Sequence, residues 1–338
     1  MPDTSNRSSL SIVVPTYKSG ATLGACLEAI RGSLDSHYEL IVVDDGNPGE
    51  DAYRTAKRYT NTVIRHSRNL GRSEAKNTGL KHSTGDILVF IDSDVVVKPD
   101  SISLIKDYFQ RHPDIDALFG SLSKLQPHDD FFSQYKNFYM YHILAALPEH
   151  VNFIYGSIHA VRRTALLRYN SDVKIADDTA LGQSFFSQGK KIAFVRNLQV
   201  THLKKYSLMT FIKNDFCIPF DWTKIFIKYA GWRQLGRNAS GYLHSPKEQL
   251  LSIVLAPIIF TVALFSCRFS SMAPIFIGLL AAWYLLNYNF LFFLFKEKGA
   301  LFGLVSLGVT FFDHLDMAAA IGAGFITHSY LLFSEHSA

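Results

Sequence analysis

Ile87-Leu88-Val89-Phe90-Ile91-Asp92-Ser93-Asp94 is the stretch that decides the fold. Five apolar residues, three of them β-branched, run directly into two carboxylates, which is typical of a buried central strand. Open α/β sheets bind ligands at the carboxyl ends of such strands. Alternate side chains of an extended segment point the same way, so Asp92 and Asp94 can converge on one point. Two hard oxygen donors suit Mg²⁺ or Mn²⁺; the alternative is an ordinary acidic turn after a strand.

Strand-like and helix-like segments alternate around this stretch. We expect further strands at residues 11–15, 40–43 and 62–64. We expect helices over about residues 21–34, 50–59 and 72–82. The alternation predicts a mostly parallel sheet with right-handed crossovers, whose post-strand loops gather at one edge.

Composition divides the chain of 338 residues into a soluble part and an apolar part. Charged residues nearly vanish from Leu250 onward. The net charge of +5 is mild, and the basic residues between Lys190 and Lys247 favour an anionic membrane surface, with no nucleic-acid partner. Three scattered cysteines fit a reducing cytosol, and the polar first ten residues predict no cleavable signal peptide.

The apolar part contains runs long enough to cross a bilayer. Residues 250–267 and 273–295 carry almost no charge and are predicted spans. In residues 301–333, Asp313-His314-Leu315-Asp316 interrupts the pattern, so we expect an interfacial approach and then a span over about 317–333, with two short spans as the alternative. With the N-terminal part in the cytosol, Lys296 and Lys298 would obey the positive-inside rule.

Two segments next to the apolar part have amphipathic patterns. Residues 207–216 and 221–229 predict two helices separated by Pro219, and Lys224 and Lys228 lie opposite the aromatic face of the second. This pattern favours a helix in the bilayer interface over a globular one. The aromatic run at residues 131–141 indicates a helix that packs into a core or lines a lipid path.

A series of motifs in order supports a family resemblance. They are Val13-Val14-Pro15-Thr16-Tyr17, Val42-Val43-Asp44-Asp45-Gly46, Asn69-Leu70-Gly71-Arg72 with the following Ala75-Lys76-Asn77-Thr78-Gly79-Leu80, Phe90-Ile91-Asp92-Ser93-Asp94, Gly156-Ser157-Ile158-His159-Ala160-Val161-Arg162-Arg163, and Ala176-Asp177-Asp178-Thr179-Ala180-Leu181-Gly182. Over about residues 11–205 the chain resembles family 2 glycosyltransferases, and in particular the polyprenyl-phosphate or lipid glycosyltransferases. The resemblance implies an α/β GT-A domain with a Rossmann-like mixed sheet over 1–205. Interfacial amphipathic helices (206–248) and a transmembrane region of about three helices (249–338) are expected to follow.

The first two motifs are expected to bind the nucleotide of a sugar donor. By resemblance, Pro15 and Tyr17 hold the base, and Asp44 and Asp45 lie in the nucleotide site. The alternative for the two acids is turn chemistry, because Asp-Gly is an ordinary turn former. No basic residue is close in sequence, so we do not expect a structural salt bridge there.

The next motifs are expected to hold the diphosphate and a metal ion. Arg72 and Lys76 lie four residues apart on one helical face and could neutralise the leaving group; the alternative is a solvated basic face. Asp92 and Ser93 would contact the donor. Asp92 and Asp94 would bind Mn²⁺ or Mg²⁺. By resemblance His202 is a further ligand for the metal, which suits Mn²⁺ better, or a contact to the diphosphate; the alternative is a structural or solvated histidine.

The last motif supplies the expected catalytic acids. By resemblance, Asp178 matches the general base that deprotonates the acceptor, and Asp177 matches the acid before it, which is usually Glu in the family. The alternative is that these acids favour a helix N-terminus.

The resemblance implies a membrane-bound, inverting, metal-dependent hexosyltransferase. It would move a sugar from a UDP- or GDP-sugar to a lipid acceptor such as a polyprenyl phosphate or a glycolipid, with its catalytic domain on the cytoplasmic side. One alternative is a processive polysaccharide synthase, although its Gln-x-x-Arg-Trp motif is absent. Others are a nucleotidyltransferase, which lacks support because no Gly-rich loop follows the first strand, and a non-catalytic membrane scaffold of the same fold.

Overall fold

The computed structural model describes residues 9–173, 175–235 and 244–329. Its contacts divide the chain into two compact units. The first unit comprises Met1–His128 and Leu144–Lys205, and the second comprises Asp129–Ile143 and Tyr206–Ala338. Residues 129–143 thus belong to the second unit although they precede position 205. The division at residues 205 and 248 stays a prediction.

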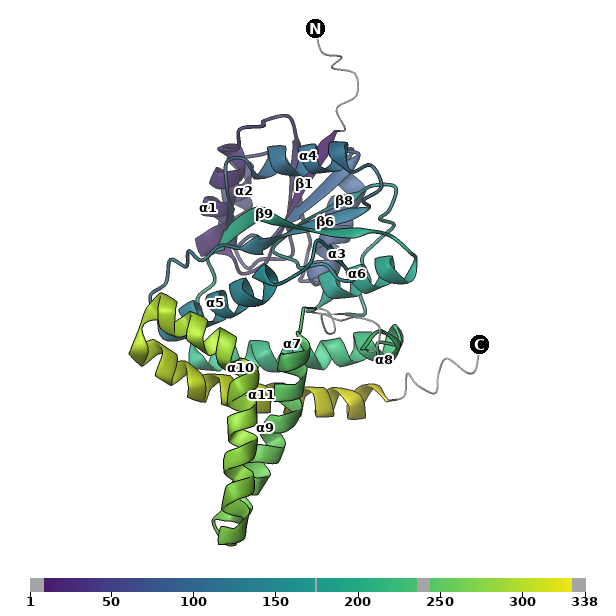
Figure 1. The fold of residues 1–338 in the computed structure, drawn as a ribbon. Helices are drawn as coiled ribbons and strands as arrows, with labels where there is room; N and C mark the ends of the chain where they lie inside the picture. Colours follow the sequence, from purple (N-terminus) through teal and green to yellow (C-terminus); the bar gives the residue numbers. More distant parts are fainter. Residues whose placement is uncertain (1–8, 174, 236–243, 330–338) are drawn as a thin grey trace. The chain divides into compact units, whose positions relative to one another are not determined.

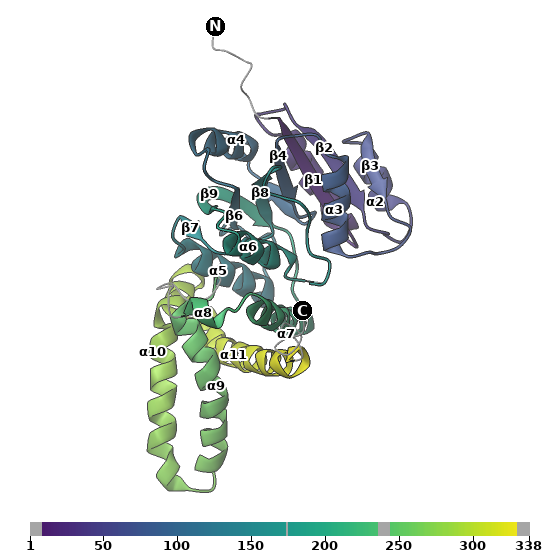
Figure 2. The ribbon, with the colours of Figure 1, turned by 90° about the vertical axis from the view of Figure 1, so that its right-hand side faces the viewer.

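The first unit is built on a mixed sheet with the strand order β3-β2-β1-β4-β8-β6-β9-β5 (Figures 1 and 2). One half is parallel and consists of β1 (Leu10–Thr16), β2 (Glu39–Asp44), β3 (Thr62–Arg65) and β4 (Ile87–Ile91). All five residues of β4 are buried, as expected for a central strand. The predicted strands of this half are therefore confirmed.

The other half of the sheet introduces the antiparallel pairs. It contains β5 (Val95–Val97), β6 (Ala117–Leu122), β7 (His150–Val151), β8 (Ile158–Arg162) and β9 (Ile192–His202). β8 is antiparallel to both β4 and β6, and β9 is parallel to β6 but antiparallel to β5 and β7. The sheet is thus mixed, as the family resemblance implied. The prediction of a mostly parallel sheet is wrong beyond β4, because β8 pairs with β4 in the antiparallel direction.

The helices of the first unit connect these strands. They are α1 (Gly20–Arg31), α2 (Asp51–Lys57), α3 (Arg72–His82), α4 (Ser101–Arg111) and α6 (Asp177–Ser187). α3 and α6 lie on the same face of the sheet (Figure 2). The chain moves from β1 to β2 in one direction and from β3 to β4 in the other, so right-handed crossovers put α1 and α3 on opposite faces.

The second unit is helical in its described residues. Its helices are α5 (Phe131–Ala145), α7 (Leu208–Lys228), α8 (Trp232–Leu235), α9 (Lys247–Ser266), a 3₁₀ turn at Ser270–Met272, α10 (Ala273–Lys298) and α11 (Ala300–His328). Among the described residues, Lys247–Ser266, Ser270–Lys298 and Ala300–His328 are long and apolar enough to cross a membrane. This agrees with the expectation of about three such helices.

Two predicted interruptions in the second unit are wrong. α7 continues through Pro219 instead of dividing into two helices, because it packs along α11 and the proline removes only one backbone donor. α11 is a single helix through Asp313 and His314, whose side chains are buried within the unit instead of ending the helix. The end of the predicted span, residues 330–333, lies outside the described residues.

The aromatic run at residues 131–141 forms most of α5 and packs into the core of the second unit. Tyr135 and Tyr139 are buried, and both rings contact Phe290 of α10. Tyr135 also meets Phe211 of α7. The core-packing interpretation therefore fits these residues.

Candidate active site

The metal-site residues expected from the sequence meet after β4. The backbone N–H of Asp92 donates to the carbonyl of Ser157 at 3.1 Å, which fixes the acid at the end of its strand. β5 pairs with β9 so that Val95 lies opposite His202, and the N–H of Leu203 donates to the carbonyl of Asp94 at 2.7 Å. This register brings His202 Nε2 within 3.5 Å of Asp94 Oδ2.

The two acids after β4 have different electrostatic environments. Burial would raise the pKa of Asp94, but the charge and hydrogen bond of His202, with Lys204, outweigh it and lower the pKa to about 2. Burial raises the pKa of Asp92; Lys76 offsets part of this effect and Asp94 adds to it. Asp94 is thus held as a carboxylate. For Asp92, the positive charge of Lys76 offsets only part of the cost of burying a negative charge.

α3 and α6 join a cation to an acid beside these residues. Lys76 Nζ lies 2.7 Å from Asp177 Oδ2, and both side chains are almost completely buried. Burial would lower the pKa of Lys76, but Asp177 and Asp92 outweigh it and raise the pKa. Lys76 is therefore not on a solvated basic face.

Arg72, one turn before Lys76, remains accessible. Half of its side chain is exposed, its Nη1 donates to the carbonyl of Ile175 at 3.1 Å, and its Nε lies 3.8 Å from Asp177 Oδ1. Burial opposes the charge of Arg72, but Asp177, Asp92, Asp178 and Asp94 together raise its pKa. Arg72 thus lies within the field of all four acids and also reaches solvent.

Asp178 has a pKa that its surroundings raise toward neutrality. Its Oδ1 accepts from the N–H of Thr179 at 2.8 Å, and the residue is half-buried. Burial and then the charge of Asp177 raise its pKa to about 6, against the opposing effects of Lys76 and Arg72. A Cβ on Gly156 would lie 2.6 Å from Asp178 Oδ2, so only glycine leaves this carboxylate its space. A carboxylate with a pKa near neutrality suits general base chemistry.

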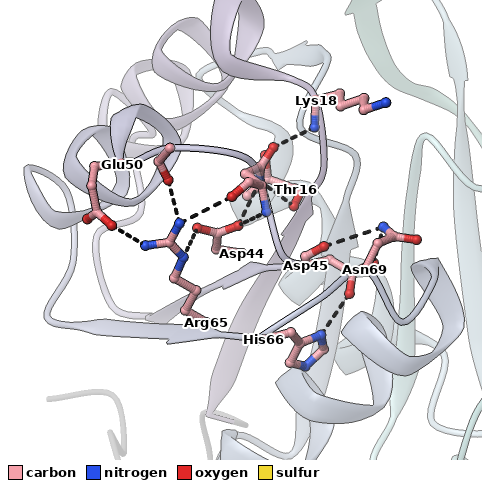
Figure 3. A network of polar contacts seen from close by, with 10 residues as sticks. Thr16, Lys18, Asp44, Asp45, Glu50, Arg65, His66 and Asn69 are labelled. Carbon is pink, nitrogen blue, oxygen red and sulfur yellow. Dashed lines mark hydrogen bonds and ion pairs between the residues drawn. The ribbon is translucent and has the colours of Figure 1, made fainter.

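Asp45 holds the loop in front of α3. Its carboxylate accepts from the backbone N–H groups of Leu70 and Gly71 and from Asn69 Nδ2, each at 2.9 Å, and His66 Nδ1 lies 2.7 Å away (Figure 3). The side chain is nearly inaccessible. This carboxylate is occupied by the protein, and it fixes the loop that places Arg72 at the start of its helix.

Asp44 is tied to the neighbouring strand. Its Oδ1 accepts from the backbone and side chain of Asn47, and its Oδ2 lies 3.2 Å from Arg65 Nε (Figure 3). The expectation that these acids lack a structural salt bridge is wrong, because β2 and β3 are parallel neighbours with Asp44 directly opposite Arg65. Asp44 and Arg65 are far apart in the sequence, so their pairing could not be predicted without the strand order.

The remaining predicted donor contacts lie at the same carboxyl edge of the sheet. Tyr17 follows β1 and is exposed, whereas Pro15 is half-buried. Ser93 is buried between the two acids of the central stretch. The parallel strands β1, β2 and β4 therefore gather the predicted nucleotide and metal residues at one edge, as the alternating pattern indicated.

Two buried aromatic side chains near Lys76 did not enter the predicted site. The Lys76 ammonium lies 5.1 Å from the centre of the Tyr169 ring, a cation–π distance. His159 Nε2 is 2.6 Å from the Tyr169 hydroxyl, and the His159 ring stacks on Phe90. The antiparallel pairing of β4 with β8 positions His159, and that pairing is not visible in the sequence.

The donor set after β4 fits a divalent cation. Asp94 and His202 already converge, and Asp92 supplies a second carboxylate beside them. In the described ranges, no group of three His, Cys, Asp or Glu side chains is arranged to hold a metal by itself. A cation here would therefore need ligands from a bound substrate to complete its coordination.

The fold defines the class of protein. The mannosyltransferase PcManGT from Pyrobaculum calidifontis, solved in complex with GDP-Man and Mn²⁺, is similar with a TM-score of 0.57 at 18% identity, over 98% of this chain and 89% of that chain. At this identity the similarity shows the fold alone, which is the GT-A fold. The mixed sheet with acids at the carboxyl end of its central strand belongs to that class.

Sequence comparisons identify the domain more closely. Residues 11–169 match the family model described as glycosyl transferase family 2. An uncharacterized glycosyltransferase of Haemophilus influenzae is 32% identical over 110 residues, 32% of this chain and 37% of the relative. A dolichol-phosphate mannosyltransferase of Pyrococcus furiosus is 31% identical over 110 residues, 31% of each chain. The chain thus spans about a third of the length of these curated relatives.

Proposed function

We propose that this chain is a membrane-attached glycosyltransferase that moves a hexose from a UDP- or GDP-sugar to a lipid acceptor. The family 2 domain and its acidic site support the reaction class. The relative named dolichol-phosphate mannosyltransferase supports a lipid acceptor. The PcManGT structure, which was solved in complex with GDP-Man, supports a nucleotide-sugar donor. The three apolar helices support attachment to a membrane.

The donor would lie along the carboxyl edge of β1, β2 and β4. Tyr17 and Pro15 would contact the base. Asp44 and Asp45 are both buried and held by protein partners, so they would hold the loops around the nucleotide in place. Arg72 would contact the diphosphate, since its guanidinium reaches solvent. Lys76 is buried and would hold Asp177 in place without touching the donor.

Asp94, His202 and Asp92 would hold a divalent cation, Mn²⁺ or Mg²⁺. A cation bound there neutralises charge on the leaving diphosphate. Arg72 would add a second positive charge, so that the leaving group is stabilised as its bond to the sugar breaks.

The position of Asp178 is the observation that carries the proposed reaction: its carboxylate occupies the space beside Gly156 at the start of α6, where burial and Asp177 raise its pKa. As an acceptor hydroxyl attacks the anomeric carbon from the face opposite the diphosphate, Asp178 would take its proton and the sugar configuration would invert. A phosphate acceptor is already ionised and needs no base. The identity of the acceptor therefore decides how much the reaction depends on Asp178.

The decisive experiment measures sugar transfer in detergent with Mn²⁺ present, from UDP- and GDP-sugars to a hydroxyl lipid and to a polyprenyl phosphate. We expect Asp178→Asn to reduce transfer to the hydroxyl acceptor by about 10²- to 10⁴-fold and transfer to the phosphate far less. Asp107→Asn, on the exposed face of α4, is the matched control and should behave as wild type. Absence of transfer from every donor by the wild-type protein would contradict the proposal.

The cytoplasmic orientation of the family 2 domain is part of the same proposal. It follows from the lysines near the end of α10, Lys296 and Lys298, which the positive-inside rule assigns to the cytoplasmic face. Arg268, near the start of the turn between α9 and α10, is a single charge against them.

A further inference from the structure

α11 has its polar residues buried and its apolar residues exposed. Ser306, Thr310, Asp313 and His314 are all buried. Its exposed large side chains include Leu301, Leu304, Val305, Phe312, Phe325 and Ile326. This distribution is the reverse of that on a helix facing water, so the outer face of α11 is suited to lipid.

α11 lies beside α7 over much of its length. Toward its C-terminal end, a Cβ on Gly324 would come 2.6 Å from Thr223 Oγ1, and the ring of His328 lies 5.0 Å from that of Phe220. In both views α7 and α11 run side by side, and both lie across the α9–α10 pair instead of alongside it (Figures 1 and 2). Any orientation of α11 in a membrane is therefore shared with α7.

α7 is unsuited to crossing a bilayer. It carries five charged residues, Lys213, Asp215, Asp221, Lys224 and Lys228. Such side chains are costly in the hydrocarbon region, and their spacing instead fits a helix in the interface. Because α11 packs along α7, a crossing α11 would bring these charges into the hydrocarbon with it.

A buried ionic group at the middle of α11 leads to the same conclusion. Lys136 of α5 pairs with Asp215 of α7 at 2.5 Å, and the charge of Asp215 acts on Asp313 of α11. Asp313 is near the midpoint of Ala300–His328, so a crossing α11 would centre this group in the bilayer. In an interfacial α11, the same group remains at the level of the lipid headgroups.

α9 and α10 differ from α11 in these respects. They form an antiparallel pair joined by the short turn at Ser270–Met272, and their exposed faces are apolar. Their charged residues lie near the ends, with Lys247 and Glu248 where α9 begins and Lys296 to Lys298 where α10 ends. A hairpin has both of these ends on one side, so it enters and leaves at the same membrane face. Trp283 Nε1 of α10 lies 3.1 Å from His314 Nδ1 of α11, so beside an interfacial α11 only residues 273–282 of α10 extend further into the lipid. At 1.5 Å per residue these residues reach about 15 Å, roughly half of a hydrocarbon core about 30 Å thick.

We propose that α11 lies in the membrane interface beside α7, with its apolar face in the lipid, and that the α9–α10 hairpin inserts into the bilayer from the same face without reaching the other. Both ends of α11 are then on the membrane face from which α9 enters, which is also the face of the family 2 domain. This inference rests on the membrane attachment proposed above and not on the transfer reaction.

Single-cysteine labelling in sealed membrane vesicles tests this topology. Cys217 is replaced by alanine and buried Cys26 stays, so exposed Cys267 near the α9–α10 turn is the first reporter. In the background Cys217→Ala, Cys267→Ser, the other reporters are Ser329→Cys after α11 and Glu28→Cys on α1, both at exposed sites. The same background without an added cysteine measures labelling of Cys26. A membrane-impermeant maleimide is applied before and after the vesicles are permeabilised.

We expect Ser329→Cys and Glu28→Cys to react from the same side, and Cys267, at the tip of the hairpin within the lipid, to react only after detergent is added. Labelling of Ser329→Cys from the side opposite to Glu28→Cys would show that α11 crosses and would overturn the proposal. Labelling of Cys267 from the side opposite to Glu28→Cys would show that the hairpin crosses and would also overturn it. A cysteine added after Ala338 is a second reporter that leaves α11 unchanged. Resistance of the protein to extraction by alkaline carbonate reports membrane attachment separately, and transfer assays report the reaction.

Discussion

Asp177 and Asp178 are adjacent in sequence but differ in what surrounds their carboxylates. Asp177 is almost completely buried and faces Lys76 Nζ at 2.7 Å, so it is unsuited to touching an acceptor. Asp178 is half-buried, has a raised pKa, and lies against Gly156. We therefore assign the proposed base to Asp178 alone and regard Asp177 as the residue that sets its charge environment.

The pKa of Asp178 predicts a pH dependence. The base must be ionised, so transfer to a hydroxyl acceptor should fall as the pH decreases through about 6. The folded state holds this proton more tightly than the unfolded chain, for which the ordinary pKa is 3.8, so the stability contributed by the acid is lost as the pH rises through about 6. Asp178→Asn should therefore raise the Tm in detergent at pH 7.5 and change it little at pH 4. An equal effect at both pH values would contradict this assignment.

The Lys76–Asp177 pair predicts a non-additive effect on stability. Lys76→Met should lower the Tm strongly, because it leaves a buried carboxylate without its partner, at a cost on the order of 3–5 kcal/mol. Asp177→Asn added to Lys76→Met should restore much of the loss, since the double variant buries no unpaired charge. Thermal unfolding of the four proteins of this cycle checks the prediction, and additive losses would show that the two residues do not act as a pair.

The secondary elements show which parts of the site were visible in the sequence. The apolar run of β4 and the acids after it predicted both the strand and the position of the site. The pairing of Asp44 with Arg65 and the position of His159 were not visible, because they depend on which strands are neighbours and in which register. The contact between His202 and Asp94 also depends on strand pairing, and only the family resemblance suggested it. Local patterns predict elements, whereas contacts across the sheet require its topology.

α7 provides a test of how packing overrides local propensity. Pro219 cannot donate to the carbonyl of Asp215, and proline costs about 3 kcal/mol relative to alanine inside a helix. Because α7 remains continuous, Pro219→Ala should keep the helix and raise the Tm, with lost packing and a more flexible unfolded chain offsetting part of the gain. Thermal unfolding in detergent, with far-ultraviolet circular dichroism to confirm unchanged helicity, measures this effect. A lower Tm would show that the ring of Pro219 is needed for packing.

α5 connects the architecture of the whole molecule to its sequence order. The chain leaves the first unit at His128 and returns to it at Leu144, and the intervening segment belongs to the second unit. In that unit Tyr135 Oη lies 2.9 Å from Thr310 Oγ1, and the rings of Tyr135 and Tyr139 are buried against Phe290. The stretch that matches the family model thus contains one helix of a helical core whose other helices come much later in the chain.

A chain shortened to end at Lys205 should therefore be poorly soluble. It would keep the sheet but expose the aromatic face of α5, because the residues that cover this face lie beyond position 205. Replacing residues 129–143 in the shortened chain by a Gly/Ser linker of equal length removes this face and should restore solubility. The fraction left in solution after ultracentrifugation without detergent measures both proteins. Equal solubility of the two proteins would mean that the aromatic face of α5 does not have to be covered by the helices after position 205. Higher solubility of the protein with the linker would show that this face limits where the chain can be divided.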